Sequence, residues 1–410
     1  MIVNGQRALA YIQKVAWVRP IEGADNIELI GVLGWTCIAK KGEFREGDFC
    51  VYFEIDSKLP ETGWSEFMRA KNFKVKTMKL GKFNVVSQGL ALPIKAFPGW
   101  DIMESSANPG KFFITACVDG DQMYFEENSD VTEALGVTYS VVEDNKRKAP
   151  SVDKYKKMAQ RNPKIFKQSW AKWLMRRAWG RKLMFAIFGK KKDKRTVWPE
   201  WVVKTDEERV QNMPWILENK EPWIATEKID GTSTTFTMKG RGRKREFYIC
   251  SRNVVFDKPD QSCFYDSNVY LEMAKKYDIE KVMAKMMEDD ETLDFITIQG
   301  ETYGAGIQKR TYGLKDHDFM AFNVILSTGD RTWRLNPELM TIFLDMYKIP
   351  CVPIVDTHFI MPDTVQELLD IATDESVIDG GMREGLVFRS YDGKQSFKAV
   401  SNEFLMKYHG

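Results

Sequence analysis

Hydrophobic and polar residues alternate in short runs along the first third of the chain. In the clearest run, residues 49–55, Phe, Val, Phe and Ile at the odd positions alternate with Cys, Tyr and Glu, the pattern of a strand with one buried face. Similar runs occupy residues 27–38, 73–80 and 90–94, separated by turns that contain glycine and aspartate. Several short strands at this spacing predict an all-β domain, a small sandwich or barrel, over residues 1–145.

The segment that opens this region gives a second indication. Residues 19–29 read RPIEGADNIEL, which is similar to the start of some tRNA-binding modules of the oligonucleotide-binding (OB) fold. A barrel of that type also fits the size of the region. We therefore expect residues 1–145 to form an OB-type oligonucleotide-binding domain.

A charged segment with a proline, residues 142–153, leads into a strongly basic stretch. Between Lys154 and Arg195 there are 16 lysines and arginines and a single acid, Asp193, although the whole chain has a net charge of only +2. Apolar residues, several of them tryptophan, recur here at helical spacing, which predicts a basic amphipathic helical linker over residues 146–197. Such a helix can be a structural connector, an RNA contact or an anchor on a membrane surface, and we expect no membrane partner.

From residue 198 to residue 410, short strands mix with helices without a regular β-α-β order. The absence of a regular β-α-β order argues for an α+β domain with antiparallel sheet rather than for a doubly wound sheet. The predicted fold class is therefore α+β, with an all-β barrel, a helical linker and an antiparallel-sheet domain in sequence. Strands are predicted at residues 234–238, 247–250, 295–299, 319–325 and 385–388, and helices at residues 270–287 and 337–347.

Composition removes several classes of protein. Hydrophobic residues make up 43% and charged residues 29% of the 410 residues, so the chain is not wholly disordered. No window approaches the roughly 18 apolar residues that a membrane-spanning helix needs, and the first residues are too polar for a signal peptide. Six cysteines without a C-x-x-C pair, with only three histidines, make a zinc site improbable and favour free thiols in a cytoplasmic protein.

ATP chemistry in this chain needs an arrangement other than a Walker-type loop, because no G-x-x-x-x-G-K-S/T sequence occurs. Residues 226–233, TEKIDGTS, place a lysine two positions before an aspartate and a glycine. A lone K-x-D-G occurs by chance, and its lysine is usually solvated. Here five further short sequences follow in order: SRN (251–253), GETYG (300–304), FMAFN (319–323), EGLVFR (384–389) and SFK (396–398).

This ordered series resembles motifs I, Ia, III, IIIa, IV and V of the covalent nucleotidyltransferases, the superfamily of ATP-dependent ligases and mRNA capping enzymes. The resemblance covers about the last 210 residues. It implies a nucleotidyltransferase domain over residues 198–410, with ATP as the nucleotide. It also implies that Lys228 attacks the α-phosphate and holds AMP as a phosphoramidate.

A lysine nucleophile must lose its proton near neutral pH. Lowering a lysine pKa from about 10.4 by roughly three units needs about 4 kcal/mol of interaction with nearby positive charge. Lys398 of motif V and a divalent cation are the expected sources, so we expect a depressed pKa at Lys228. Lys398 is also expected to neutralise charge that builds up on the α-phosphate.

The resemblance assigns the metal and the remaining contacts. Glu384 of motif IV is expected to hold the metal directly or through its water shell, and oxygen ligands suit Mg²⁺ or Mn²⁺. The other assignments are Asp230 as the partner of Lys228 or of the metal, Glu301 on the ribose or the metal waters, Phe322 stacked on adenine, Arg252 on a phosphate or the substrate, and Glu227 on the adenine amino group.

Two positions depart from the motifs. Motif V often reads K-x-K, but Ser396 stands in the place of its first lysine. Either Lys394 replaces that lysine or one lysine suffices. Ser233 occupies a position that usually contacts the ribose.

The domain order distinguishes between branches of the superfamily. DNA ligases and capping enzymes carry an OB domain after motif V, whereas only 12 residues follow Lys398 here, and the predicted OB domain precedes the motifs. This order resembles that of ATP-dependent RNA ligases with an N-terminal OB domain and an RNA ligase 2-like catalytic domain, and residues 198–209 are similar to their lead-in.

We therefore expect an RNA ligase that joins 3′-OH and 5′-phosphate ends in RNA repair or nick sealing. RNA is the expected partner, RNA/DNA hybrid nicks are a further candidate substrate, and the oligomeric state is left open. The alternatives are a capping-type guanylyltransferase and a catalytically inactive RNA-binding protein.

Overall fold

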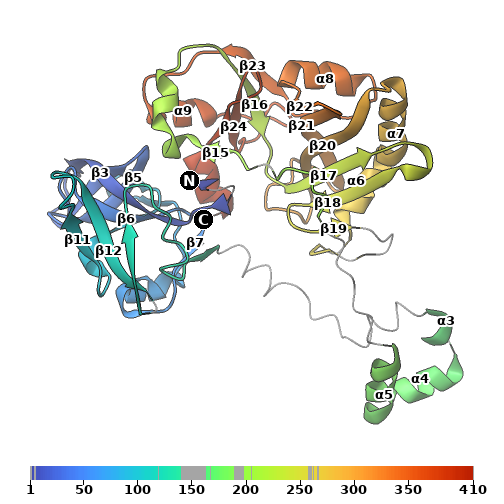
Figure 1. Ribbon diagram of the computed structural model, residues 1–410, viewed down its shortest axis with the longest axis horizontal. Coiled ribbons are helices and arrows are strands. Elements are labelled where there is room, and N and C mark those ends of the chain that lie inside the picture. The colour runs from blue at the N-terminus through green and yellow to red at the C-terminus, as the bar shows by residue number, and fades with distance from the viewer. Residues whose placement is uncertain are drawn as a thin grey trace. The chain divides into compact units, whose positions relative to one another are not determined.

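The computed structural model describes residues 2–3, 6–118, 120–139, 163–166, 168–188, 198–204, 206–256, 261, 263–265 and 267–409 (Figure 1). The chain forms two compact units. The first combines residues 1–140 with residues 199–410, and the second comprises residues 141–198.

The N-terminal part of the first unit is built on a five-stranded antiparallel sheet with the order β10-β6-β3-β4-β5. A bulge between Val15 and Trp17 lets one long strand pair with β6 along its first half and with β4 along its second. The Gln88 N–H donates to the Thr36 carbonyl (2.7 Å), which connects β5 to the residues before β10. The strands are β3 (Ala10–Pro20), β4 (Ile27–Val32), β5 (Trp35–Lys40), β6 (Phe49–Phe53) and β10 (Leu90–Pro93).

Three strand predictions in this part need correction. Residues 27–38 form two strands, because Leu33 takes a positive φ (52°) and turns the chain. Residues 73–80 contribute only β8 (Met78–Leu80), because the preceding 3-10 helix ends in left-handed residues and Phe73 turns into the core. Strand β6 is buried on both faces, because one hydrophobic cluster covers its odd positions and a second covers Cys50 and Tyr52.

Smaller elements complete this region. They include a three-stranded sheet and short two-stranded pairings around the barrel. The elements are β1 (Ile2–Val3), β2 (Gln6–Arg7), β7 (Ser57–Lys58), β9 (Val85–Ser87), β11 (Asp101–Glu104), β12 (Phe112–Val118), β13 (Asp121–Phe125), β14 (Thr138–Tyr139) and 3-10 helices at Gly63–Lys71 and Ile94–Ala96.

The C-terminal part of the first unit contains two sheets. One has five strands in the order β15-β25-β24-β16-β23, and the other has six in the order β19-β18-β17-β20-β21-β22. The strands are β15 (Glu208–Arg209), β16 (Trp223–Lys228), β17 (Thr232–Lys239), β18 (Glu246–Ser251), β19 (Val255–Phe256), β20 (Leu293–Gly304), β21 (His317–Thr328), β22 (Arg331–Arg334), β23 (Ile354–Phe359), β24 (Gly385–Ser390) and β25 (Ser396–Val400).

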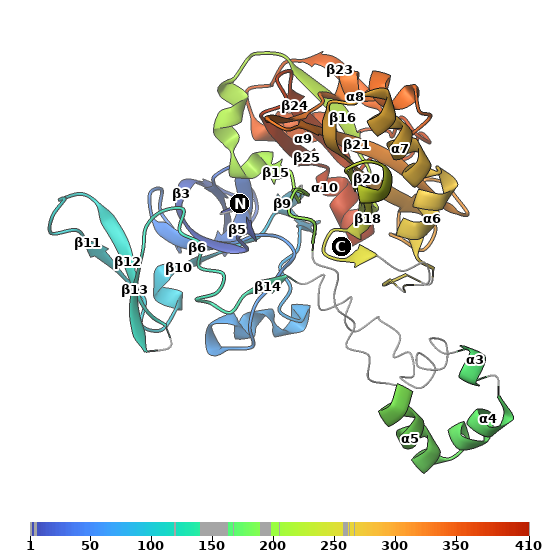
Figure 2. The ribbon, with the colours of Figure 1, turned by 45° about the vertical axis from the view of Figure 1, so that its right-hand side comes forward.

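Helices cover one side of each sheet. The apolar faces of α6 (Val269–Lys276), α7 (Ile279–Asp289) and α8 (Pro337–Asp345) share one core with the six-stranded sheet (Figure 2). Helix α9 (Val365–Ala372) packs on the five-stranded sheet. The helix predicted over residues 270–287 is two helices, because Asp278 takes a positive φ (48°) between them. Short 3-10 helices lie at Val210–Asn212, Pro214–Glu218 and Gly242–Lys244.

A buried polar contact joins the barrel to the two-sheet part. The Asn212 side-chain oxygen accepts hydrogen bonds from the Tyr11 hydroxyl (2.8 Å) and the Trp35 indole (2.6 Å), and its amide donates to Glu54 (2.7 Å). Beside it, the Gly34 N–H donates to the Gln211 carbonyl (2.8 Å). A Cβ at Gly34 would lie 2.8 Å from the Gln211 Cα, so only glycine allows this approach.

The second unit contains α3 (Pro163–Phe166), α4 (Ser169–Met175) and α5 (Ala178–Phe188). Ala171 and Met184 are buried, Trp173 packs edge-on against Trp179, and the Arg177 guanidinium lies 3.8 Å from the Trp173 ring centre. The predicted linker segment 142–153 and the basic residues 190–195 lie outside the described residues. Within the described part, no helix is both long and apolar enough to cross a membrane.

Candidate active site

The K-x-D-G sequence lies where the two sheets of the C-terminal part meet. Lys228 ends β16 of the five-stranded sheet, and Thr232 begins β17 of the six-stranded sheet. The three residues between them therefore carry the chain from one sheet to the other. A Cβ at Gly231 would lie 2.4 Å from the Thr302 carbonyl oxygen, so this crossing requires glycine.

Strand pairing brings the predicted nucleophile to the predicted metal-binding carboxylate. Lys228 lies opposite Gly385 in the pairing of β16 with β24, and Glu384 directly precedes that strand. The Lys228 ammonium donates a hydrogen bond to Glu384 (2.8 Å). The Lys228 side chain is 24% exposed, so it is not fully enclosed by protein.

The acids around Lys228 determine the direction of its pKa in the protein alone. Burial favours loss of its proton, but attraction to Glu384, Glu301 and Asp230 outweighs burial and raises its pKa. The physical reason for the raised pKa is that strand pairing surrounds this lysine with carboxylates. The expected depression of the Lys228 pKa includes a divalent cation as a source of positive charge, so it stays a prediction for the metal-bound protein.

The same carboxylates are short of compensating positive charge. Burial, together with repulsion from neighbouring acids, raises the pKa of Glu301 to about 8 despite the nearby Lys228, and burial also raises the pKa of Glu384. The buried Asp230 Oδ1 lies 3.3 Å from His409 Nε2, whereas Oδ2 has no hydrogen-bond partner. Three acids around one lysine, with an unpaired carboxylate oxygen, suit a divalent cation.

These side chains do not form a complete metal cage. Among the described residues, no three His, Cys, Asp or Glu side chains converge closely enough to hold a metal by themselves. Magnesium commonly binds through one or two carboxylates and completes its shell with water and phosphate oxygens. The donors therefore fit a cation that is bound together with a nucleotide.

A second group of charges gathers around Asp206. Its carboxylate accepts from Lys398 (3.0 Å) and from Arg252 (2.5 Å). Although burial opposes its ionisation, these cations hold the Asp206 pKa well below its usual value. Burial lowers the Lys398 pKa. Asp206 acts to raise it, but the positive charges of Arg209 and Lys228 add to the lowering. The structure thus brings Lys398 and Arg252 together through an acid that sequence analysis missed.

Arg209 is a second residue that sequence analysis did not single out. It lies opposite Lys398 in the parallel pairing of β15 with β25 and is only 8% exposed. Its Nε and Nη1 atoms are buried without a hydrogen-bond partner. The guanidinium lies 5.9 Å from the Trp35 ring centre, and its two free donor nitrogens beside a lysine fit an anionic group such as a phosphate. Its place within the lead-in sequence was the available signal.

The motif V departure, Ser396, lies on the strand that pairs with Arg209. Ser396 donates a hydrogen bond to Glu207. Lys394 is 81% exposed and forms an ion pair with Asp392 (3.1 Å). Arg209, on the neighbouring strand, is therefore a candidate for the second cation beside Lys398.

The two predicted adenine contacts have partners of their own. Glu227 is buried and accepts from the Ser376 hydroxyl and the Val377 N–H (2.8 Å), and burial raises its pKa. A contact to the adenine amino group would require Glu227 to share these bonds. Phe322 is half-buried in a small cluster that includes Ile229, directly after the predicted nucleophile.

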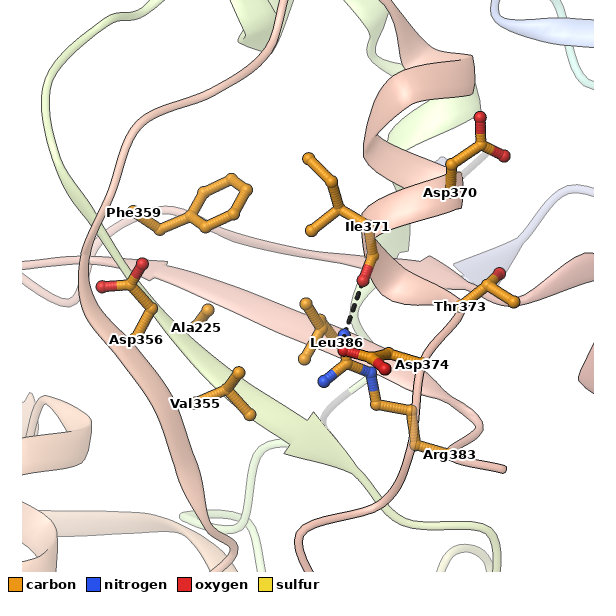
Figure 3. Close-up of a pocket in the computed structure, with 10 residues that line it drawn as sticks. All are labelled: Ala225, Val355, Asp356, Phe359, Asp370, Ile371, Thr373, Asp374, Arg383 and Leu386. Carbon is orange, nitrogen blue, oxygen red and sulfur yellow. Dashed lines mark hydrogen bonds and ion pairs between the residues drawn. The ribbon is translucent and has the colours of Figure 1, made fainter. Parts of the chain in front are cut away.

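A separate cleft of about 390 Å³ lies beside the five-stranded sheet, against α9 (Figure 3). Ala225 and Leu386 contribute from the sheet, and the Arg383 guanidinium donates to the Ile371 carbonyl within it. None of the predicted site residues lines this cleft. We therefore place the candidate active site at the junction of the two sheets.

Two parts of the chain match models of known protein families. Residues 221–409 match a family model described as RNA ligase, and residues 9–94 match a model described as an OB-fold domain. No curated protein sequence matches the chain.

Among solved structures, the chain is similar to Naegleria gruberi RNA ligase. A lysine-to-methionine variant of that protein with AMP and Mn is 28% identical, with a TM-score of 0.69 and coverage of 98% of this chain and 99% of that chain. A lysine-to-alanine variant with ATP and Mn is 27% identical, with a TM-score of 0.68 and the same coverage. The structure with PPi is 27% identical, with a TM-score of 0.67 and coverage of 98% and 99%.

Proposed function

We propose that the chain, whose residues 221–409 match the RNA ligase family model, joins the 3′-OH and 5′-phosphate ends of RNA, with ATP as the nucleotide and Mg²⁺ or Mn²⁺ as the metal. The observation that carries this proposal is the Lys228–Glu384 contact of 2.8 Å at the junction of the two sheets. Similarity to ligase structures that contain ATP or AMP with Mn supports the same nucleotide and metal here. It also favours ligation over guanylyl transfer or a catalytically inactive RNA-binding protein.

We propose three steps in which each bond formed replaces one broken. Lys228 Nζ attacks the α-phosphorus of ATP, so that a P–N bond forms and the bond to pyrophosphate breaks. The RNA 5′-phosphate then attacks the lysyl-AMP, which joins AMP to the RNA end and releases the lysine. Finally the 3′-OH attacks the activated 5′-phosphate, and AMP leaves with the electrons of the broken P–O bond.

The chain's own residues prepare the first step. Lys228 must lose a proton to solvent before it attacks, and its hydrogen bond of 2.8 Å to Glu384 holds it in place for that step. Glu384, Asp230 and Glu301 would hold the divalent cation directly or through water. When bound, that cation supplies positive charge that stabilises the phosphates and lowers the pKa of a nearby ammonium group.

In this proposal, the phosphates of ATP bind to the second group of charges, which surrounds Asp206. Lys398, Arg209 and Arg252 present positive charge around Asp206, and Arg209 has two unpaired N–H groups. These donors would stabilise the negative charge on the α-phosphate and on pyrophosphate. Phe322 would stack on adenine, Glu227 would read its amino group, and Glu301 would contact the ribose or metal waters.

Different parts of the chain are proposed to activate ATP and to bind RNA. We propose that residues 198–410 activate ATP and the 5′-end, and that residues 1–145 bind RNA as an OB domain. Residues 146–197 form the basic linker. Nick sealing or RNA repair in the cytoplasm, with RNA/DNA hybrid nicks as a further substrate, is the cellular role that we propose.

Incubation with radiolabelled ATP or GTP and either metal tests the nucleotide and the covalent step. We expect label on the protein from ATP alone, and ligation of nicked RNA in the same reactions. Label from GTP alone would indicate a guanylyltransferase, and a protein that takes no label would contradict the proposal. Ligation assays on a panel of RNA, DNA and hybrid nicks then show whether the 3′-OH end, the 5′-phosphate end or both must be RNA.

A further inference from the structure

The segment after motif V returns to the K-x-D-G sequence. It comprises α10 (Asn402–Phe404) and one π-helical turn, Leu405–His409. At its end, His409 Nε2 lies 3.3 Å from Asp230 Oδ1, and the side chain of His409 is 34% exposed. A hydrogen bond to Asp230 raises the pKa of His409.

Four contacts fix the position of this histidine. The segment starts where the Ser401 N–H donates to the Glu384 carbonyl (2.9 Å), and the fully buried Phe404 anchors its middle. The Phe404 ring lies 5.9 Å from the His409 ring. From the barrel side, Lys76 donates to the His409 carbonyl (3.3 Å), and Gln88 donates to Asn402 (2.7 Å).

Asp230 is held from two directions as a result. The Tyr312 hydroxyl accepts a hydrogen bond from the Asp230 backbone N–H (2.8 Å), and His409 contacts Oδ1. Oδ2, in contrast, is buried without a partner. A carboxylate with one oxygen held and one unpaired presents the second oxygen in a single orientation, as outer contacts do for ligands in metal sites.

We propose that His409 is a positioning residue for lysine adenylylation, because its Nε2 orients the Asp230 carboxylate beside the nucleophile. This inference rests on the proposed ligase function. His409 acts through Asp230 and contacts no reacting atom. The segment Asn402–His409 is, on this account, a part of the active site and not only the end of the fold.

The test uses side chains that differ in reach. In full-length protein, glutamine can place an amide nitrogen where His409 has Nε2, whereas asparagine is too short and alanine has no donor. Lys407→Ala is the matched control, because Lys407 is exposed in the same helical turn. The readouts are the single-turnover rate of AMP transfer to the protein at saturating ATP, the KM for ATP and the melting temperature.

We expect His409→Ala and His409→Asn to slow AMP transfer by about 10- to 100-fold, with His409→Gln restoring most of the rate. The KM for ATP should change little, because the variants lose the orientation of the Asp230 carboxylate and keep the groups that bind the nucleotide. A wild-type rate in His409→Ala would overturn the proposal, and so would a glutamine variant as slow as alanine. Equal losses in Lys407→Ala would assign the effect to the segment as a whole and also overturn it.

The wild-type protein separates this proposal from the one on which it rests. If wild-type protein takes no label from ATP, the ligase function fails and the histidine comparison has no signal. If wild-type protein is labelled and all four variants match it, only the role of His409 fails.

Discussion

Two groups of charges lie close together at the candidate active site, and they are unbalanced in opposite directions. Around Lys228, the acids Asp230, Glu301 and Glu384 outnumber the lysine, and the pKa values of Glu301 and Glu384 are raised. Around Asp206, the cations Lys398 and Arg252 outnumber the acid, and its pKa is held low.

The contrast assigns a different ligand charge to each group. An excess of carboxylates is relieved by a cation, and an excess of cations is relieved by an anion. A nucleotide with a divalent metal carries both charges and would satisfy both groups at once. The raised Lys228 pKa then describes the protein before the metal binds, and cation binding to the carboxylates would reverse its direction.

The largest expected effect is the loss of the nucleophile. Lys228→Ala should abolish AMP transfer from ATP to the protein and ligation of ends that are not already activated, because no other residue supplies the P–N bond. Sealing of a pre-adenylylated strand should persist, since that step does not need the lysine. Acid-labile AMP on the mutant protein would contradict the assignment.

Removing one member from each group should have the next largest effect. Glu384→Ala and Lys398→Ala should each reduce the rate of protein adenylylation by about 100-fold or more, the scale of a lost preorganised charge. The two groups should differ in one respect: added Mg²⁺ or Mn²⁺ should partly restore Glu384→Asp but not Lys398→Ala. Near-normal adenylylation of either alanine variant would show that its motif was assigned wrongly.

The opposite pKa shifts predict opposite effects of pH on stability. Glu301 has a folded pKa of about 8 against an ordinary 4.5, so its contribution is present at low pH and is lost as pH rises towards 8. Asp206 has a folded pKa below its ordinary 3.8, so its contribution is present above that value and is lost in acid. Glu301→Gln should flatten the first decline and Asp206→Asn the second, each by about 1–3 kcal/mol.

Urea unfolding of the ligand-free protein between pH 3 and pH 9 measures both declines. The wild-type profile supplies the reference, and each variant should change only its own limb. If both variants keep the wild-type profile, the charge imbalance that distinguishes the two groups does not exist in solution.

The smallest expected effect concerns the substitute lysine of motif V. Lys394 is 81% exposed and paired with Asp392, so Lys394→Ala should change the adenylylation rate by less than about twofold. Arg209→Ala should instead cause a loss of about 10-fold or more, because Arg209 lies beside Lys398. Steady-state labelling of both variants at one ATP concentration tests this difference. The reverse order would return the second motif V cation to Lys394.

The sequence predicted what repeats locally or follows a known motif. Alternating residues predicted strands such as β17 and β24, and the ordered motifs predicted a ligase-type domain after an OB-type barrel, which the fold and the family match confirm. Turns that depend on one positive φ, at Leu33 and Asp278, were missed, because leucine rarely adopts that conformation and a single aspartate within a helical pattern is only a weak signal for it.

Contacts between distant segments explain the remaining differences at the site. Asp206 and Arg209 reach Lys398 only through the parallel pairing of β15 with β25, and His409 reaches Asp230 across most of the domain. The raised pKa of Lys228 has the same origin, because Glu301 and Glu384 approach it from separate strands. The spacing of residues along the chain does not predict these contacts.

The most direct test of the central claim is to locate the AMP. Wild-type protein is incubated with ATP and Mg²⁺ or Mn²⁺, digested at a pH that preserves a phosphoramidate, and sequenced by mass spectrometry. The proposed mechanism predicts one AMP per chain, attached to Lys228 Nζ. AMP on any other residue, or a protein that remains unmodified while it ligates RNA, would contradict it.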